Sequence, residues 1–116
     1  MTHDEFSEKK GGAFTNELSL VHRLILDAHP AIYRTVKYGY PFCCMKKNLF
    51  YLDVQKDRPL LALVYAYKMT DVIELLDFTG RTQIGHYFID NLSDKKLAEV
   101  GLLIDTAVQF DLGRKR

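Results

Sequence analysis

Apolar residues near the start of the chain recur at intervals of three and four, which is the spacing of one face of an α-helix. The pattern predicts a helix from Thr15 to Asp27. The side-chain oxygen of Thr15 or Asn16 can accept a hydrogen bond from a free backbone N–H at its start. The residues expected on its buried face are Leu18, Val21, Leu24, Ile25 and Ala28.

The pair His29-Pro30 interrupts this pattern. Proline cannot continue the first helix, but it suits the first turn of another. We therefore predict a short second helix from Ala31 to Tyr38, with Ile32 and Val36 facing inward. Gly39 would end it in the left-handed conformation that is common after helices.

The middle of the chain favours a β-sheet. Predicted strands cover Tyr40–Lys46, Leu49–Gln55 and Leu60–Tyr67, with turns at Lys47-Asn48 and over residues 56–58. The third of these strands is apolar at every step, so we expect a central position that is covered on both faces. The short loop before it predicts an antiparallel hairpin with the second strand.

The last third of the chain is less regular. Residues 68–82 fit either a short turn of helix or a short strand, whereas Gln83–Asp90 alternates as a strand does, with His86 and Phe88 on one side. Ser93 is a suitable N-cap for a final helix that ends at Gly113. Its expected buried stripe consists of Leu97, Val100, Ile104, Ala107 and Val108.

This order of elements predicts an α+β fold, with an antiparallel sheet of about five strands and helices packed on one face. The 116 residues suffice for one domain, and their composition, 47% hydrophobic and 27% charged, is that of ordinary globular proteins. We expect a flexible leader over residues 1–14, one domain over 15–113 and a solvated basic tail over 114–116.

Charge and cysteine content narrow the classes of function. The net charge is only +1, whereas nucleic-acid binders usually carry a basic excess, so no nucleic-acid partner is expected. Cys43 and Cys44 are neighbours, which argues against a disulfide framework and for reduced thiols. The start of the chain lacks the apolar core of a signal peptide, and no apolar run approaches the roughly 20 residues of a membrane span. We therefore expect a cytoplasmic protein without a membrane partner.

Three short motifs carry a likeness to a known family. They are Lys37-Tyr38-Gly39-Tyr40-Pro41-Phe42, the segment Asn48–Val54 (NLFYLDV), and the segment Gly80–Ile89 (GRTQIGHYFI) before the last helix. Over about residues 16–112 the chain resembles the YdhG-like family, also called domain of unknown function 1801. The resemblance implies a two-layer α+β sandwich related in outline to frataxin.

Some members of that family carry an iron-chaperone label, so an intracellular iron-binding chaperone is one hypothesis. Iron(II) prefers carboxylate and imidazole ligands. Frataxin-type iron handling is associated with acidic residues crowded along the first helix, which here holds only Glu17 and Asp27, ten residues apart. The acids of the predicted leader are Asp4, Glu5 and Glu8, and no histidine belongs to a metal-ligand pair such as HExxH. We assign no metal ligands and expect no cofactor, with iron as the alternative.

The leading hypothesis is a non-enzymatic module that binds a small ligand or a protein. Its candidate groove joins Lys37, Tyr38 and Pro41 of the first motif to Arg81 and His86 of the third, provided that the fold brings the two motifs together. Such a groove suits a small anion or a carboxylate.

Two further expectations concern catalysis and self-association. No catalytic motif is present, but a closed pocket holding His86 beside a carboxylate would favour an enzyme, because a paired histidine is a common general base. Tyr51, Tyr65 and Tyr67 are expected to face outward, where they would suit a homodimer interface.

Overall fold

The computed structural model describes residues 14–113. The predicted leader, apart from Phe14, and the basic tail lie outside this range, as do Asp4, Glu5 and Glu8. The helices are α2 (Thr15–Ala28) and α3 (Asp94–Asp111), and the strands are β1 (Tyr33–Lys37), β2 (Tyr40–Cys44), β3 (Asn48–Gln55), β4 (Arg58–Leu63) and β5 (Gly85–Phe88). Two 3₁₀ turns, η3 (Ala66–Lys68) and η4 (Ile73–Leu75), lie between β4 and β5.

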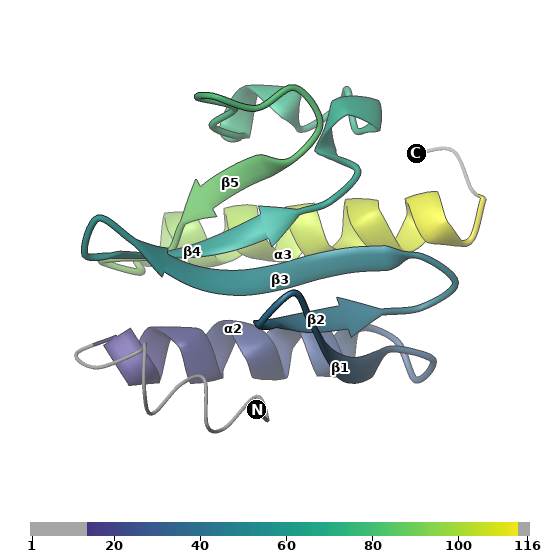
Figure 1. Cartoon of the computed structure of the whole chain (residues 1–116), viewed down its shortest axis with the longest axis horizontal. Helices are drawn as coiled ribbons and strands as arrows, with labels where there is room; N and C mark the ends of the chain where they lie inside the picture. The colour runs from purple at the N-terminus through teal and green to yellow at the C-terminus, as the bar shows by residue number, and fades with distance from the viewer. Residues whose placement is uncertain (1–13, 114–116) are drawn as a thin grey trace.

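The strands form one antiparallel sheet in the order β1-β2-β3-β4-β5, so every strand pairs with its neighbours in the sequence. Both helices pack against the same face of this sheet and against each other (Figure 1). The predicted α+β architecture, with about five strands and helices on one face, is confirmed. The opposite face of the sheet carries no helix among the described residues.

The two long helices follow the apolar periodicity that predicted them. In α2, Leu18, Val21 and Ile25 are buried, whereas Leu24 is half-buried and Ala28 is exposed. The predicted cap at Thr15 or Asn16 is wrong, because the N-cap position is Phe14 and no side chain caps this helix by a hydrogen bond. At the start of α3 the side chain of Ser93 accepts a hydrogen bond from the backbone N–H of Lys96 at 3.2 Å, as expected for an N-cap. The buried residues of α3 include Val100, Leu103, Ile104, Ala107 and Val108, whereas Leu97 is half-buried.

The predicted second helix over residues 31–38 is wrong, because this segment contains strand β1. All five residues of β1 pair with β2, from Tyr33 opposite Cys44 to Lys37 opposite Tyr40. Tyr38 and Gly39 both have positive φ, 55° and 78°, which is the backbone of a type I′ hairpin turn. A helix this short gains little from propensity alone, whereas pairing with β2 stabilises the β-branched and aromatic residues of the segment.

The strand predicted over Leu60–Tyr67 ends earlier, at Leu63. Its partner β3 begins at Asn48, so residues beyond Val64 have no strand to pair with, and the chain turns into η3. The ambiguous residues 68–82 hold η4 and a single β-bridge between Asp77 and His86. The last strand is correspondingly shorter than predicted, Gly85–Phe88.

The first predicted strand also ends early, at Cys44, where a bulge shifts the register between Cys43 and Cys44. A bend over residues 45–47 replaces the predicted two-residue turn. The carboxylate of Asp111, at the end of α3, accepts hydrogen bonds from the backbone N–H groups of Lys46 (3.1 Å) and Lys47 (2.9 Å). This contact anchors the β2–β3 connection to the helix layer.

Within residues 14–113, no helix combines the length and apolar character that a membrane crossing requires.

Candidate functional site

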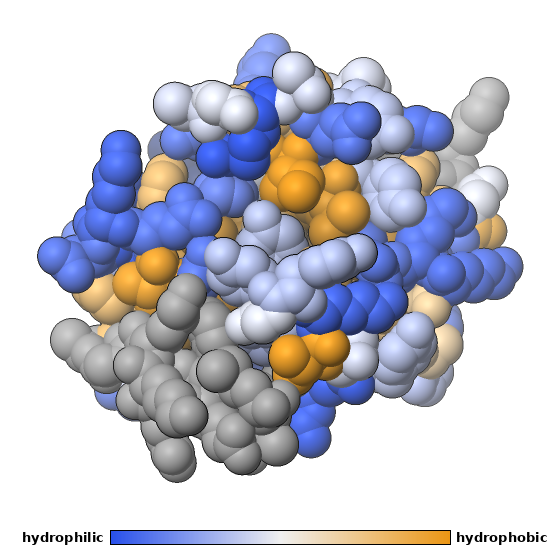
Figure 2. Space-filling model, in the orientation of Figure 1, coloured by the Kyte–Doolittle hydropathy of each residue, from blue (hydrophilic) through white to orange (hydrophobic). Residues whose placement is uncertain are grey.

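The helix-free face of the sheet carries a row of side chains from neighbouring strands. Phe42 lies opposite Tyr51, Tyr51 opposite Ala62, and Ala62 opposite His86. Successive residues of a strand point to opposite faces. Because Phe50, Leu61 and Tyr87 belong to the core beneath the helices, this row lies on the other face. Figure 2 shows apolar side chains gathered near the middle of the molecule, with hydrophilic ones around them.

His86 is the polar centre of this face. Its side chain is buried, with 2% of its surface exposed, yet its Nε2 has no hydrogen-bond partner among residues 14–113. Its backbone N–H and carbonyl are both bonded to Asp77, at 2.9 Å and 2.8 Å. Burial, and then the positive charge of Arg81, lower the pKa of His86 to about 4. The imidazole is therefore neutral near pH 7, and Nε2 can donate or accept one hydrogen bond.

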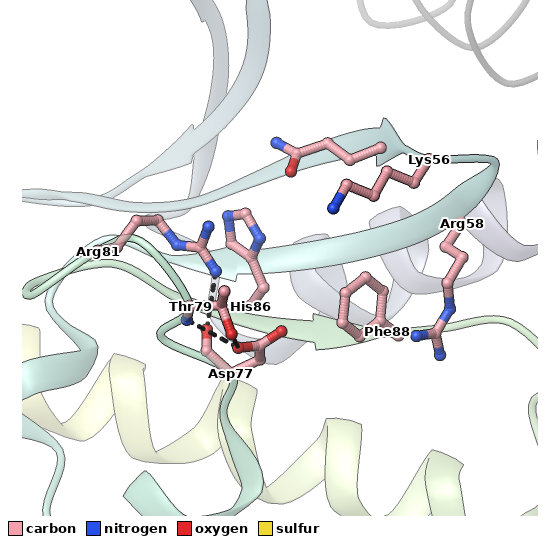
Figure 3. A pocket seen from close by; sticks show the side chains of 8 residues that line it. Lys56, Arg58, Asp77, Thr79, Arg81, His86 and Phe88 are labelled. Carbon is pink, nitrogen blue, oxygen red and sulfur yellow. Dashed lines mark hydrogen bonds between the residues drawn. The ribbon is translucent and has the colours of Figure 1, made fainter.

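A pocket of about 340 Å³, here called the His86 pocket, opens beside this side chain (Figure 3). Its volume falls within the usual range of small-molecule sites. Residues of the β3–β4 turn, of the segment before β5 and of β5 itself contribute to it. The lining residues are Gln55, Lys56, Arg58, Asp77, Thr79, Arg81, His86 and Phe88.

Arg81 is held in place by backbone carbonyls. Its Nε donates to the oxygen of Ile84 at 3.2 Å, and its Nη2 donates to the oxygen of Asp77 at 3.0 Å. These bonds leave Nη1 able to donate to a ligand. The carboxylate of Asp77 accepts from the backbone N–H (2.8 Å) and hydroxyl (2.6 Å) of Thr79, and these bonds lower its pKa. The carboxylate is thus engaged in its own turn and does not form the hydrogen bonds that fix Arg81.

The remaining cations of the pocket differ in how fully they are neutralised. The guanidinium of Arg58 lies 3.8 Å from the centre of the Phe88 ring and donates two hydrogen bonds to Asp90, at 2.9 Å and 3.2 Å. Lys56 is exposed in the β3–β4 turn. Because Arg58 is paired with Asp90, Lys56 and Arg81 against Asp77 leave one excess positive charge in the lining, which favours an anionic ligand.

A second hollow of about 320 Å³, here called the tyrosine pocket, lies over β2 and β3. The ring of Tyr51 is 5.4 Å from that of Tyr40 and 5.1 Å from that of Phe42, and the rings are tilted toward one another. On its other side, the ring of Tyr51 meets that of His86 edge to face, at 6.4 Å. The residues that line the tyrosine pocket are Tyr38, Tyr40, Phe42, Asn48, Tyr51, Val64 and Ile84.

The structure divides the predicted groove between these two hollows. Arg81 and His86 lie together in the His86 pocket, and Tyr38 lies in the tyrosine pocket. Lys37 donates through Nζ to the side-chain oxygen of Asn48 at 2.7 Å, at the edge of the tyrosine pocket. Pro41 is buried in β2 between Tyr40 and Phe42, so its ring faces the opposite side of the sheet.

Several lining residues were not predicted from the sequence. The sequence alone places Lys56 and Arg58 in a turn between two strands, and Asp77 in the stretch 68–82 that fits either a helical turn or a strand. The alternation of core-facing and outward-facing residues along β3 could have identified other residues of the open face. With Phe50 and Leu52 on the core side, Tyr51 and Asp53 must lie on the open face, as the structure places them. Both Asp53 and His86 are buried there.

The possible metal ligands, the two cysteines and the tyrosines expected to face outward do not form a second candidate site among the described residues. Among residues 14–113, no three histidine, cysteine, aspartate or glutamate side chains are grouped so that they could hold a metal ion. Cys43 and Cys44 are buried, and burial raises the pKa of the Cys43 thiol to about 12, so it is not a thiolate. Of the three tyrosines expected to face outward, Tyr67 is exposed, whereas Tyr51 and Tyr65 are half-buried. The ring of Tyr65 packs against that of Phe110, with ring centres 5.5 Å apart.

The fold and its open, partly polar sheet face define a two-layer α+β class of small domain. A solved structure of the same class is that of YdhG, a DUF1801-family protein from Bacillus subtilis, with a TM-score of 0.56 and 15% sequence identity. The alignment covers 96% of this chain and 95% of that protein. The resemblance to the YdhG-like family is thus confirmed for the fold. No family model matches the sequence, and no curated protein does.

Proposed function

We propose that this protein is a non-enzymatic binding module for a small organic anion, a carboxylate, which the His86 pocket holds. The observation that carries the proposal is the Nε2 atom of His86, which is buried beside the guanidinium of Arg81 and finds no partner in the described part of the chain. A buried polar atom without a partner costs free energy, commonly about 1–3 kcal/mol, and a ligand that supplies the missing hydrogen bond recovers it.

The chemistry of the pocket supports a carboxylate in particular. Arg81 is oriented by two backbone carbonyls and keeps Nη1 for a ligand oxygen. A neutral His86 can donate one hydrogen bond to the second oxygen of the same carboxylate. Lys56 adds a positive charge at the rim of the pocket. Charge-assisted hydrogen bonds of this kind are about twice as strong as neutral ones.

A binding role is favoured over proton transfer by the state of His86. A general base works best with a pKa near the working pH, whereas the pKa of His86 is lowered to about 4. The nearby carboxylate of Asp77 bonds to Thr79 rather than to the imidazole. The pairing of histidine with carboxylate that would favour an enzyme is therefore not among the hydrogen bonds of this pocket.

The iron-chaperone alternative gains no supporting observation from the described residues. Glu17 and Asp27 both lie on α2, which packs on the face of the sheet away from the His86 pocket. An iron(II) titration with saturable binding at a fixed ratio would restore this alternative.

The proposal is tested by titrating ¹⁵N-labelled protein with propionate and, separately, with inorganic phosphate. We expect saturable shifts of the Arg81 and His86 signals with propionate. Arg81→Gln should abolish the shift of the His86 signal, and Lys56→Asn, which suits the positive φ of 51° at this position, should weaken binding several-fold. Arg23→Gln is the matched control, because Arg23 is exposed on α2, across the sheet from the pocket.

Two results would overturn the proposal. One is the absence of any saturable response of the wild-type protein to propionate at tens of millimolar. The other is saturation by phosphate alone, which would assign the pocket to a different class of anion. Circular dichroism of each variant separates lost binding from lost folding.

A further inference from the structure

We infer that the ligand carries an aromatic ring as well as a carboxylate, with the carboxylate in the His86 pocket and the ring against Tyr51 in the tyrosine pocket. This inference rests on the proposed function and specifies the class of ligand. It predicts a compound with one ring and one acid group joined by a short spacer.

The two pockets meet along the open face of the sheet. Tyr51 lines the tyrosine pocket, His86 lines the His86 pocket, and their rings are in edge-to-face contact. A second link is the hydrogen bond from Nε of Arg81 to the carbonyl oxygen of Ile84, because these residues also line different pockets. A ligand that passes over Tyr51 can therefore reach both.

Charge is separated between the two pockets. All the charged lining side chains, Lys56, Arg58, Asp77 and Arg81, belong to the His86 pocket. The tyrosine pocket is lined by four aromatic rings, two aliphatic side chains and Asn48. Ligand sites commonly combine an apolar, aromatic wall with a few polar groups that fix orientation. This division favours a ligand with an anionic end and a neutral, planar end.

Tyr38 is an independent indication that the tyrosine pocket is used. It occupies the first central position of the β1–β2 turn with φ of 55°, a conformation that favours asparagine, aspartate or glycine. Tyr38 is 87% exposed, and its ring meets that of Phe42 edge to face, at 6.3 Å between centroids. A bulky residue in a strained backbone position contributes little to stability, and such outliers concentrate at functional sites. Tyr38 stands where it can cover a ring bound against Tyr51.

The separation of the two pockets determines the length of the spacer between the ring and the carboxylate of the ligand. The centres of the Tyr51 and His86 rings are 6.4 Å apart. A ring stacked on Tyr51 and a carboxylate at Nε2 of His86 are joined over a comparable distance by two methylene groups. The probe that fits this geometry is 3-phenylpropionate.

The test compares three probes by NMR titration of the full chain. They are 3-phenylpropionate, propionate, which lacks the ring, and 3-phenylpropan-1-ol, which lacks the charge. We expect 3-phenylpropionate to bind at least tenfold more tightly than either of the others, which corresponds to about 1.4 kcal/mol. Tyr38→Asn should remove most of the advantage over propionate while leaving propionate binding unchanged. Tyr67→Asn is the matched control, since Tyr67 belongs to η3 and lines neither pocket.

The outcomes separate this inference from the proposed function. Equal affinities for 3-phenylpropionate and propionate would overturn the inference and keep the anion site. If 3-phenylpropionate keeps its whole affinity advantage over propionate in Tyr38→Asn, the ring of the ligand binds elsewhere, and this result would also overturn the inference. Failure of both carboxylates, or equal binding of the alcohol and the acid, would overturn the proposed function as well.

Discussion

The imidazole of His86 and the phenol ring of Tyr51 meet edge to face, 6.4 Å apart, on the sheet face that the helices leave open. The contact helps to bury His86 in its neutral form. Burial and then the positive charge of Arg81 oppose protonation of His86, and the carboxylates of Asp53 and Asp77 offset this only in part. The stability of the fold is therefore sensitive to pH through this one side chain.

Stability should fall as the pH is lowered from about 6.5 to about 4. The pKa of His86 is about 4 in the folded protein, below the ordinary value of 6.5 expected in the unfolded chain, so over this interval the unfolded chain binds the proton more readily. We expect the free energy of unfolding of the wild type, relative to that of His86→Gln, to decrease across it by about 1–3 kcal/mol. Urea unfolding at several pH values measures this, with His29→Gln as the control. A difference independent of pH would contradict the prediction.

Replacing Tyr38 should improve the hairpin while it weakens binding. Asparagine tolerates positive φ far better than tyrosine, and Asn-Gly is the preferred type I′ sequence. Tyr38→Asn should therefore raise the free energy of unfolding by about 0.5–1 kcal/mol. Thermal unfolding measures the change. Tyr33→Asn, within β1, should instead be destabilising, because asparagine is unfavourable in strands. Lower stability of Tyr38→Asn would contradict this account of the turn.

Asp111 should matter more than an ordinary surface acid. Its carboxylate is 2% exposed and accepts the backbone N–H groups of Lys46 and Lys47. In Asp111→Asn the amide nitrogen would face one of these donors, so we expect a loss of about 2–3 kcal/mol in urea unfolding. Asp71→Asn, at an exposed position, is the control and should change stability by no more than about 0.5 kcal/mol. Equal effects of the two changes would contradict the anchoring role of Asp111.

Replacing Gly85 and Gly101 with alanine should have opposite effects on the stability of the protein. A Cβ on Gly85 would lie 2.9 Å from the Cβ atoms of both Ala66 and Leu76, so Gly85→Ala should cost about 1–3 kcal/mol. Gly101 is exposed in α3 and has nothing within 4 Å of such a Cβ. Gly101→Ala should stabilise the helix by about 0.5–1 kcal/mol. Denaturant unfolding of both variants tests the pair, and a neutral Gly85→Ala would show that the contact relaxes freely.

The elements that the sequence predicted well are those with local determinants. The apolar spacing of α2 and α3 and the Ser93 cap depend only on residues within a few turns of one another. Residues 31–38 were mistaken for a helix because Ile32 and Val36 fit the inward face of either element. Gly39 has positive φ in both readings, as a helix end or as the second residue of a hairpin turn. Only the pairing of β1 with β2 distinguishes them.

The candidate site likewise has a part that local sequence predicts and a part that depends on long-range pairing. Arg81 and His86 were found because they lie five positions apart in one motif. Their proximity to Tyr51 and Lys56 depends on β3 and β5 flanking β4 in the sheet, and residues 64–84 separate β4 from β5 along the chain. Local sequence patterns do not predict such a pairing between strands. The grouping of Pro41 with the groove failed for a simpler reason, since neighbouring residues of a strand face opposite sides.

The bridge between Asp77 and His86 has a consequence for the protein's behaviour at high concentration. β5 is one of the two outer strands of the sheet, and an exposed outer strand invites pairing with another molecule. Asp77 occupies both outward backbone groups of His86, and Arg81 occupies the carbonyl of Ile84. The segment that supplies Arg81 to the proposed anion site therefore also closes this edge against aggregation. Shortening that segment would remove the proposed ligand site and the protection in a single step.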